Sequence, residues 1–253
     1  MKISIITAVY NREKTIEHCI NSVLSQTYKN IEYIVIDGHS TDGTIDIVKK
    51  YEDKIDKFII ERDDGLYHAM NKGIKLATGD LIGFLHSDDL YFDKQVLSCV
   101  ANKFDNNSLL DACYGDMLYS HQFDASRIER YWKSSPFVPG SFSKGWSPPH
   151  LPFFVKHEIY KKYGSFNTEY KISSDIDLMM RFLEVHRINS EYVPKIFVKM
   201  RNGGISTLLK NKVKQNLEVL SALKSHSLSS NIFIFFAYKV ISRLKQRLQK
   251  PTS

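Results

Sequence analysis

The chain contains few cysteines, no long apolar run and neither of the common glycine-rich phosphate loops. Its three cysteines, Cys19, Cys99 and Cys113, are odd in number and lack CxxC spacing, which argues against a disulfide framework or a zinc site and favours a reducing compartment. No apolar stretch approaches the roughly 20 residues of a membrane-spanning helix, and the first residues lack a signal-peptide pattern. The dinucleotide fingerprint and the lysine-containing phosphate loop do not follow any predicted strand, which excludes the usual sites of those two classes.

The composition that remains, 43% hydrophobic and 25% charged over 253 residues, is that of a globular protein. The net charge of +7 is unevenly distributed, since residues 208–250 hold nine Lys and Arg and one acid, Glu218. The body therefore carries about −1, which excludes a basic groove for nucleic acid. The basic carboxyl-terminal tail predicts contact with an anionic surface.

Short β-branched runs alternate with helical periodicity over the first 90 residues. They predict strands at 3–9, 33–36, 58–60 and 81–85 with helices between them, and hence right-handed βαβ units and a parallel sheet. Ligands of such sheets bind beyond the carboxyl ends of the strands. The polar residues at those ends are 7–11, Asp37, 62–65, Asp88 and Asp89.

The second half is less regular. It predicts strands at 113–119 and 128–132, a helix at 175–185 and a long loop at 134–152 that holds five of the seven prolines. That loop is a candidate acceptor loop or lid. We expect one domain over residues 1–207 and a basic amphipathic helical tail over 208–253.

Each polar motif has a structural and a functional interpretation. Asp37 can accept hydrogen bonds from a pyrimidine base or a ribose, or form an Asx turn. Asp88 and Asp89 are suitable ligands for Mg²⁺ or Mn²⁺, or a helix-capping pair. Asp175 is a candidate general base or a first-turn acid of its helix. His150 can contact a sugar or a phosphate, or play a structural role in its loop.

The motifs become specific in combination. The order and spacing of these motifs resemble those of the inverting family 2 glycosyltransferases of the GT-A fold, of the type that builds bacterial surface polysaccharides. The resemblance covers residues 3–207 and rests on residues 7–12, 32–44, 64–73 and 77–89, followed by His150, 174–178 and 203–206.

This resemblance implies a Rossmann-like, mostly parallel sheet flanked by helices, with a carboxyl-terminal helical tail. It implies that Asp88 and Asp89 hold Mn²⁺ or Mg²⁺, that Asp175 is the base and that His150 binds the acceptor. The residues implied to bind or approach a nucleotide-sugar donor are Thr7, Ala8, Tyr10, Arg12, Asp37, Asp64, Lys72 and Asp88. Two positions depart from the family pattern: His86 stands where an acid is common, and Ser174 where a glutamate is common.

The expected function is therefore transfer of a hexose, with inversion, from a UDP-sugar to a lipid-linked saccharide in O-antigen, capsule or exopolysaccharide synthesis. The alternatives are a sugar-phosphate nucleotidyltransferase, which needs a Gly- and Arg-rich loop that residues 7–12 do not supply, and a non-catalytic carbohydrate- or lipid-binding module. The apolar segment 231–241 runs into basic residues, which suits a helix lying in a membrane interface or one packed on the body. We expect a cytoplasmic protein attached peripherally to the inner face of the cell membrane.

Overall fold

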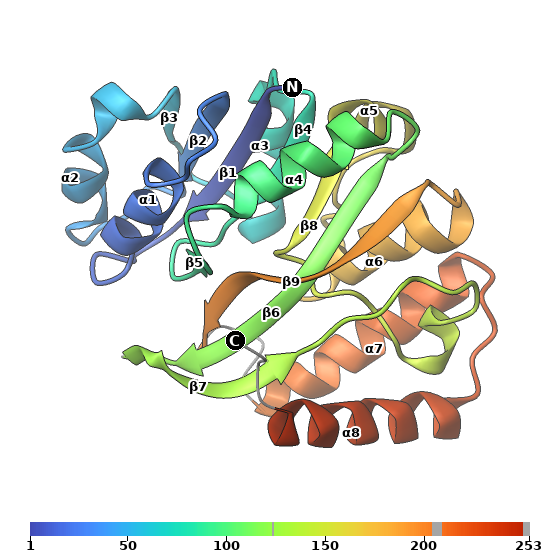
Figure 1. Cartoon of the computed structure of the whole chain (residues 1–253). Helices are drawn as coiled ribbons and strands as arrows, with labels where there is room; N and C mark the ends of the chain where they lie inside the picture. The colour runs from blue at the N-terminus through green and yellow to red at the C-terminus, as the bar shows by residue number, and fades with distance from the viewer. Residues whose placement is uncertain (123, 204–208, 250–253) are drawn as a thin grey trace.

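Parallel strands form the amino-terminal half of the sheet. In the computed structural model, which describes residues 1–122, 124–203 and 209–249, β1 (Ile3–Val9), β2 (Ile31–Asp37) and β4 (Leu81–Phe84) are buried apolar runs. The predicted elements of this half are confirmed to within a few residues, with η1 (Glu52–Lys54) added (Figure 1). The remaining elements of this half are β3 (Lys57–Ile60), α1 (Ile16–Leu24), α2 (Thr44–Lys49) and α3 (Leu66–Leu76).

The second half contains more short elements than the sequence predicted. The expected strands and helix appear as β6 (Ala112–His121), β7 (Asp124–Trp132) and α6 (Ser174–Met180), and α4 (Val96–Asn106) precedes them. The predicted helix at 175–185 is confirmed, although regular α-helix ends at Met180 and the run continues as a wider π-helical turn, η3 (Arg181–Val185). The pattern did not identify β5 (Leu90–Tyr91), η2 (Phe142–Lys144), β8 (Phe153–Lys156), α5 (His157–Tyr163) and β9 (Ser190–Arg201).

The strands run in the order β3-β2-β1-β4-β8-β6-β9-β5, with β7 paired to β6. The first four are parallel; β8 then pairs antiparallel with both β4 and β6, while β6 and β9 are parallel. Asp37 is in register with Val9 and Ile60, so β1, β2 and β3 end together and bring the following loops to one edge.

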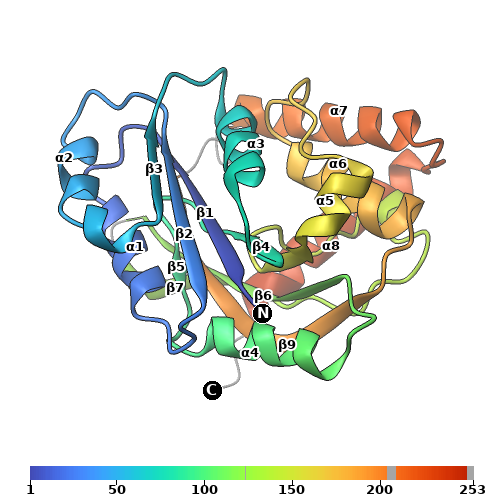
Figure 2. The same cartoon turned by 90° about the horizontal axis from the view of Figure 1, so that it is seen from above.

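Helices cover both faces of the sheet (Figures 1 and 2). One apolar cluster joins the sheet to α1 and α4, and the other joins it to α3, α5 and α6. Close packing requires glycine at residue 73. A Cβ on Gly73 would lie 2.3 Å from Cγ2 of Ile6, so glycine lets α3 pack directly on β1.

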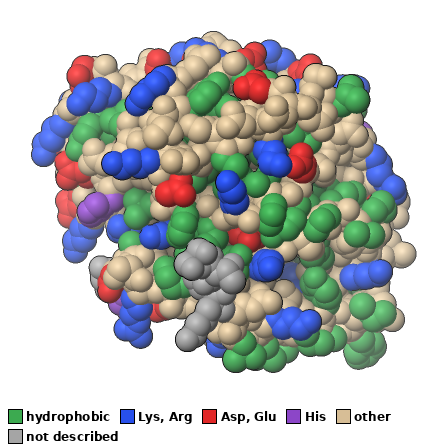
Figure 3. Space-filling model, viewed as in Figure 1, with side chains coloured by type: hydrophobic (Ala, Val, Ile, Leu, Met, Phe, Trp, Pro, Cys, Tyr) green, Lys and Arg blue, Asp and Glu red, His purple; other side chains and the backbone are tan. Residues whose placement is uncertain are grey.

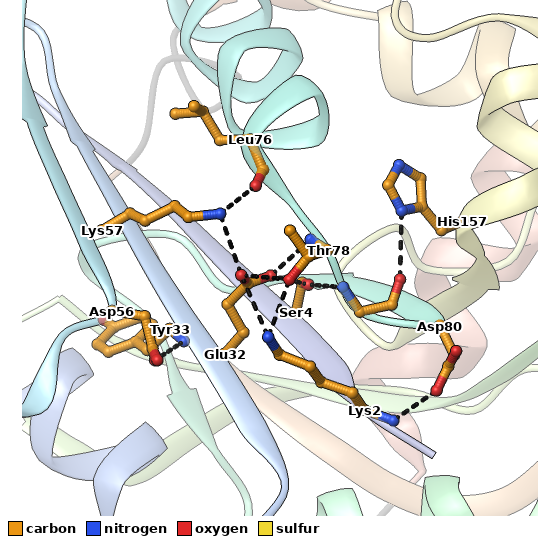
Figure 4. Close-up of polar contacts among 11 residues, drawn as sticks. Lys2, Ser4, Glu32, Tyr33, Asp56, Lys57, Leu76, Thr78, Asp80 and His157 are labelled. Carbon is orange, nitrogen blue, oxygen red and sulfur yellow. Dashed lines mark hydrogen bonds and ion pairs between the residues drawn. The ribbon is translucent and has the colours of Figure 1, made fainter.

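A polar cluster closes the opposite, amino-terminal edge of the parallel strands (Figure 4). The buried carboxylate of Glu32 accepts hydrogen bonds from Ser4 Oγ at 2.5 Å and from the backbone N–H and Oγ1 of Thr78, both at 2.7 Å. Lys57 Nζ lies 3.1 Å from it and Lys2 Nζ 3.4 Å. This cluster ties β1 and β2 to the turn before β4, and it lies away from the predicted site.

Two helices follow the sheet, α7 (Leu209–Ser225) and α8 (Ile232–Leu248). Val219, Ala222 and Leu223 of α7 and Phe235 of α8 are buried in the cluster that includes α6. The predicted domain boundary at 207/208 lies outside the described residues, as do the predicted motif positions 204–206. Within the described ranges, no helix combines the length and apolar character needed to cross a membrane.

Candidate active site

The loops that follow β1 and β2 are bonded to each other at the carboxyl edge of the sheet. The backbone N–H of Asn11, which has a φ of 51°, donates to Ser40 Oγ at 2.9 Å, and Asn11 Oδ1 accepts from the Thr41 N–H at 2.8 Å. The Arg12 N–H donates to Thr44 Oγ1 at 2.7 Å. Two segments about 30 residues apart therefore form one rim.

Asp37 and Tyr10 lie together on this rim. The buried Asp37 carboxylate accepts from the Ser40 N–H at 2.6 Å and from Ser40 Oγ at 2.8 Å, so the expected Asx-type turn is present. The Tyr10 side chain is 57% exposed, and its ring lies against Gly38, where an added Cβ would be 3.4 Å from Tyr10 Cδ2. The rim thus pairs an exposed aromatic ring with a fixed carboxylate, although the turn already uses both carboxylate oxygens.

Thr7 and Ala8 lie inside the strand end. The Thr7 hydroxyl is fully buried and donates to the carbonyl of Leu85 at 2.9 Å, which links β1 to the end of β4. Ala8 is also buried. The Thr7 hydroxyl is therefore already hydrogen-bonded within the protein. The predicted contact of Thr7 and Ala8 with a nucleotide stays a prediction.

Lys72 of α3 holds the loop that follows β3. Its Nζ lies 2.7 Å from Asp63 Oδ1 and 2.9 Å from Glu61 Oε2, and these contacts raise the pKa of Lys72. The neighbouring Asp64 is exposed. Sequence reasoning named Asp64 and missed Asp63, since the pattern does not show which of two adjacent acids faces the helix. A role of Asp64 and Lys72 near a donor stays a prediction.

The two carboxylates after β4 have different surroundings. Asp89 is 1% exposed and accepts from the backbone N–H of Arg201 at 2.9 Å, and burial together with the charge of Asp88 raises its pKa well above the usual range. Asp88 is partly exposed and forms no hydrogen bond or ion pair with any side chain that the structure describes. Asp88 is therefore the carboxylate available to a ligand, while Asp89 fastens the β4 loop to β9.

Asp175 lies in the first turn of α6, beneath α3. Its Oδ1 accepts from the Tyr67 hydroxyl at 3.1 Å, and its Oδ2 lies 3.3 Å from His150 Nδ1. Burial raises the pKa of Asp175 to about 6, a shift that the Tyr67 hydrogen bond opposes. A carboxylate with a pKa near neutrality can accept a proton from a hydroxyl group and release it again.

His150 connects Asp175 to the β4 loop. Its ring lies 5.4 Å from that of His86, between centroids. Burial lowers the pKa of each histidine to about 4, and in His86 the neighbouring His150 adds to this effect. Both imidazoles are therefore neutral near pH 7, and His150 joins the two motifs predicted to hold the metal and the base.

Helix α7 supports the segment that leads to Asp175. The Glu218 carboxylate accepts from the backbone N–H groups of Lys171, Ile172 and Ser173, at 3.1, 2.8 and 2.9 Å. Sequence reasoning missed Glu218, the one acid of a basic segment, because its targets lie 45 residues away. Asp177, two residues after Asp175, lies 2.8 Å from His226 and 3.4 Å from Arg181, and so links α6 to the end of α7.

Comparison with known proteins identifies the family of the chain. Residues 4–166 match the family described as glycosyl transferase family 2. The chain belongs to this family. It is 29% identical to an uncharacterized glycosyltransferase of Rickettsia typhi, over 92% of this chain and 79% of that protein. It is 27% identical to a PGL/p-HBAD biosynthesis glycosyltransferase of Mycobacterium bovis, over 83% of this chain and 80% of that protein.

Solved structures share the fold of this family 2 enzyme. Staphylococcus aureus TarS 1–349, crystallised with UDP-GlcNAc, superimposes with a TM-score of 0.69 over 88% of this chain and 66% of that chain, at 22% identity. The expected GT-A fold is thereby confirmed. The family match favours glycosyl transfer over the nucleotidyltransferase and the binding module.

The apolar wall of this glycosyltransferase site explains the basicity of Asp175. The carboxylate opens on a small pocket whose other walls are mainly aromatic and aliphatic: Met70, Phe84, Phe153, Tyr160, Phe166, Leu178 and Met179. Tyr67 stacks on Phe166 with 5.4 Å between ring centroids, which holds the Tyr67 hydroxyl on the carboxylate. An ionised carboxylate is poorly solvated in such a pocket, and this favours its protonated form.

Proposed function

We propose that this family 2 enzyme transfers a hexose from a UDP-sugar to a hydroxyl group of a lipid-linked saccharide, with inversion, in the assembly of a cell-surface glycan. The observation that carries the proposal is Asp175, a largely buried carboxylate with a pKa of about 6 that His150 and His86 connect to the strand end bearing Asp88. The UDP-GlcNAc in the TarS structure supports a UDP-sugar donor, and the Mycobacterium relative is named for PGL/p-HBAD biosynthesis, which is compatible with a glycan-assembly role.

The donor would lie along the carboxyl edge of the strands. Tyr10 would stack on uracil, and Asp37 and Ser40 would shape the base and ribose pocket, with Thr7 and Ala8 behind them. The adjoining loops bring Arg12, Asp64 and Lys72 to the same edge. We assign these residues to donor binding as a group.

A divalent metal fits the residues at Asp88. Asp88 is partly exposed and has no side-chain partner among the described residues, and Mn²⁺ or Mg²⁺ can be held by one or two carboxylates together with water and phosphate oxygens. Asp88 would hold the ion, with Asp89 and His86 beside it. When bound, the metal would neutralise charge on the departing diphosphate.

Asp175 would act on the acceptor. It would take the proton of the acceptor hydroxyl as that oxygen forms a bond to the anomeric carbon. The bond from this carbon to the UDP oxygen breaks on the opposite face, and UDP leaves with the bonding electrons. A single displacement inverts the configuration, so an α-linked donor gives a β-linked product. His150 would orient Asp175 and contact the acceptor sugar.

The tail would place this site at a membrane. Helix α8 packs on the body through Phe235, while apolar side chains at helical spacing face outward, along the lower edge of the molecule (Figures 1 and 3). They include Phe233, Val240, Ile241, Leu244 and Leu248, each more than half exposed. We call these five residues the apolar stripe. A stripe of this kind flanked by Lys and Arg suits the interface of an anionic bilayer.

Three experiments test the proposal. Release of UDP from a panel of UDP-sugars, with the anomeric configuration of the product read by ¹H NMR, tests the reaction; no release, or a retained configuration, would overturn it. EDTA should abolish activity and Mn²⁺ restore it, whereas full activity with chelator would show that cationic side chains hold the diphosphate.

The role of the apolar stripe is tested by sedimentation with phosphatidylglycerol vesicles. The double variant Phe233→Ser, Leu244→Ser should no longer sediment with them, while Leu109→Ser, at another exposed leucine, should still do so.

A further inference from the structure

Arg130 of β7 is an unusually placed cation. Its guanidinium carbon lies 3.5 Å from the centroid of the Tyr119 ring and 5.7 Å from that of Trp132, and these two rings stack at 6.3 Å. Burial lowers the pKa of Arg130, and the charges of Arg243 and Arg247 lower it further. The aromatic pair fixes the guanidinium on one face and leaves its edge for other partners.

The neighbours of Arg130 on α8 are positive as well. Arg243 and Arg247 are one helical turn apart, and Lys239 precedes them by another turn. Among the described residues, no carboxylate forms an ion pair with Arg130, Arg243 or Arg247, and the charge of Arg243 also lowers the pKa of Lys239, after burial, to about 8. Like charges at this spacing repel each other, and a bound anion would relieve that repulsion.

The cluster adjoins both the acidic motif and the apolar stripe. Ser120, which follows Tyr119 on β6, is in register with Arg201 of β9, and the backbone N–H of Arg201 donates to Asp89. On the other side, α8 packs against β7 (Figure 1), and Arg243 and Arg247 lie on the same helix as the apolar stripe. The charges of Asp89 and Asp175 also contribute to the raised pKa of Tyr119, for which burial is the larger cause. An anion bound here would lie beside the loop that bears Asp88 and on the helix that bears the stripe.

We propose that Arg130, Arg243 and Arg247 bind the phosphate groups of the acceptor, a lipid diphosphate whose first sugar then enters the pocket of Asp175. Guanidinium groups bind phosphate oxygens through paired hydrogen bonds, and a diphosphate supplies enough charge for three cations. The inference deepens the proposed function and rests on it. A purely structural stack of Arg130 on its two rings would not need two further arginines that repel it.

Binding of decyl diphosphate to the full chain tests the site. The fluorescence of Trp132 monitors binding in a Trp146→Phe background, and EDTA is present to remove any bound metal ion. Because a charge-assisted hydrogen bond contributes about 1.5–3 kcal/mol, Arg243→Gln with Arg247→Gln should weaken binding about 10- to 100-fold. Arg130→Lys keeps the positive charge but loses the paired N–H donors of the guanidinium group, and should weaken binding about tenfold. Arg127→Gln, on the same strand and exposed, should change binding less than twofold.

Unchanged affinity in the double variant would overturn the site. Equal affinity for decyl glucoside would also overturn it, since the phosphates would then contribute nothing. Competition by UDP with Mn²⁺ would assign the arginines to the donor instead. Binding to vesicles distinguishes the source of the phosphate. The double variant should bind neutral vesicles that contain a diphosphate lipid more weakly than the wild type does. An equal loss of binding to phosphatidylglycerol vesicles would indicate a surface that binds anionic lipid headgroups in general. If the wild type releases no UDP from any donor while these arginines still bind decyl diphosphate, the proposed function fails and the binding site stands.

Discussion

Glu32 is a buried carboxylate and Asp175 a largely buried one, but the protein surrounds them in opposite ways. At the amino edge of the strands, burial alone would raise the pKa of Glu32, yet hydrogen bonds from Ser4, Thr78 and Lys57 together lower it to about 2. At the opposite end, Asp175 has Tyr67 and His150 beside it in an apolar pocket, and burial keeps its pKa raised to about 6.

The difference shows how one side chain serves stability or chemistry. Glu32 accepts hydrogen bonds on both oxygens, so its ionised form stabilises the folded state and has little affinity for a substrate proton. Asp175 has too few hydrogen-bond donors to offset its desolvation, so its ionised form destabilises the folded state. The same desolvation raises its proton affinity and makes it a useful base. Substituting the amide at each position should therefore have opposite consequences.

Asp175→Asn should produce the largest effect. Loss of a general base typically lowers turnover about 10²- to 10⁴-fold, while donor affinity should stay within twofold. The melting temperature should remain unchanged or rise, because a buried charge is removed. Initial rates and a thermal unfolding curve measure both. Turnover within twofold of the wild type would place the base elsewhere, and a large fall in melting temperature would make Asp175 a structural residue.

Glu32→Gln should act in the reverse sense. We expect a loss of about 2–4 kcal/mol in the free energy of unfolding, since several charge-assisted hydrogen bonds are weakened together, with unchanged activity per folded molecule. Urea unfolding measures it, and Glu52→Gln, an exposed glutamate, is the control. The lowered pKa sets the pH dependence: the contribution of Glu32 is complete above about pH 4.5 and is lost as the pH falls towards 2. Equal urea midpoints for the two variants would contradict this role.

The pH dependence of turnover sharpens the comparison further. Asp175 must be ionised to accept a proton and has a pKa of about 6, so turnover should rise about tenfold between pH 5 and pH 7. The rising limb should vanish in Asp175→Asn. A profile of kcat from pH 4.5 to 8 with saturating donor measures this. A limb centred near pH 4 would mean that an ordinary, solvated carboxylate limits the reaction.

Glu218→Gln should give the smallest effect, because it changes only the support of the segment before Asp175. An amide can accept from fewer of the three backbone N–H groups, so kcat should fall about 3- to 10-fold with KM for the donor unchanged. The pH limb should shift along with kcat if Glu218 positions the base. The exposed Glu169 is the control, as Glu169→Gln. An unchanged kcat and pH limb would show that α7 is not needed to place Asp175.

Much of the fold could be predicted from the sequence. The first half consists of continuous apolar strands and amphipathic helices, in which local periodicity and packing agree, so every strand from β1 to β4 was expected. The short strands β5 and β8 were missed because their positions depend on partners in β9, β4 and β6, far away in the chain. The tail was expected to be helical and amphipathic, and its described part consists of two helices, with Ser227 at a φ of 57° between them.

For the site, the sequence by itself determined which residue types stand at the strand ends, including Asp37, Asp88 and Asp175, because turn chemistry and apolar runs are local. The tertiary structure alone decided which carboxylate is saturated and which is basic. Glu32 and Asp89 are held by groups far away in the chain, and Asp175 owes its raised pKa to a pocket lined by α3, α5 and α6. Desolvation and hydrogen bonding act through space, and sequence spacing does not encode the distances on which they depend.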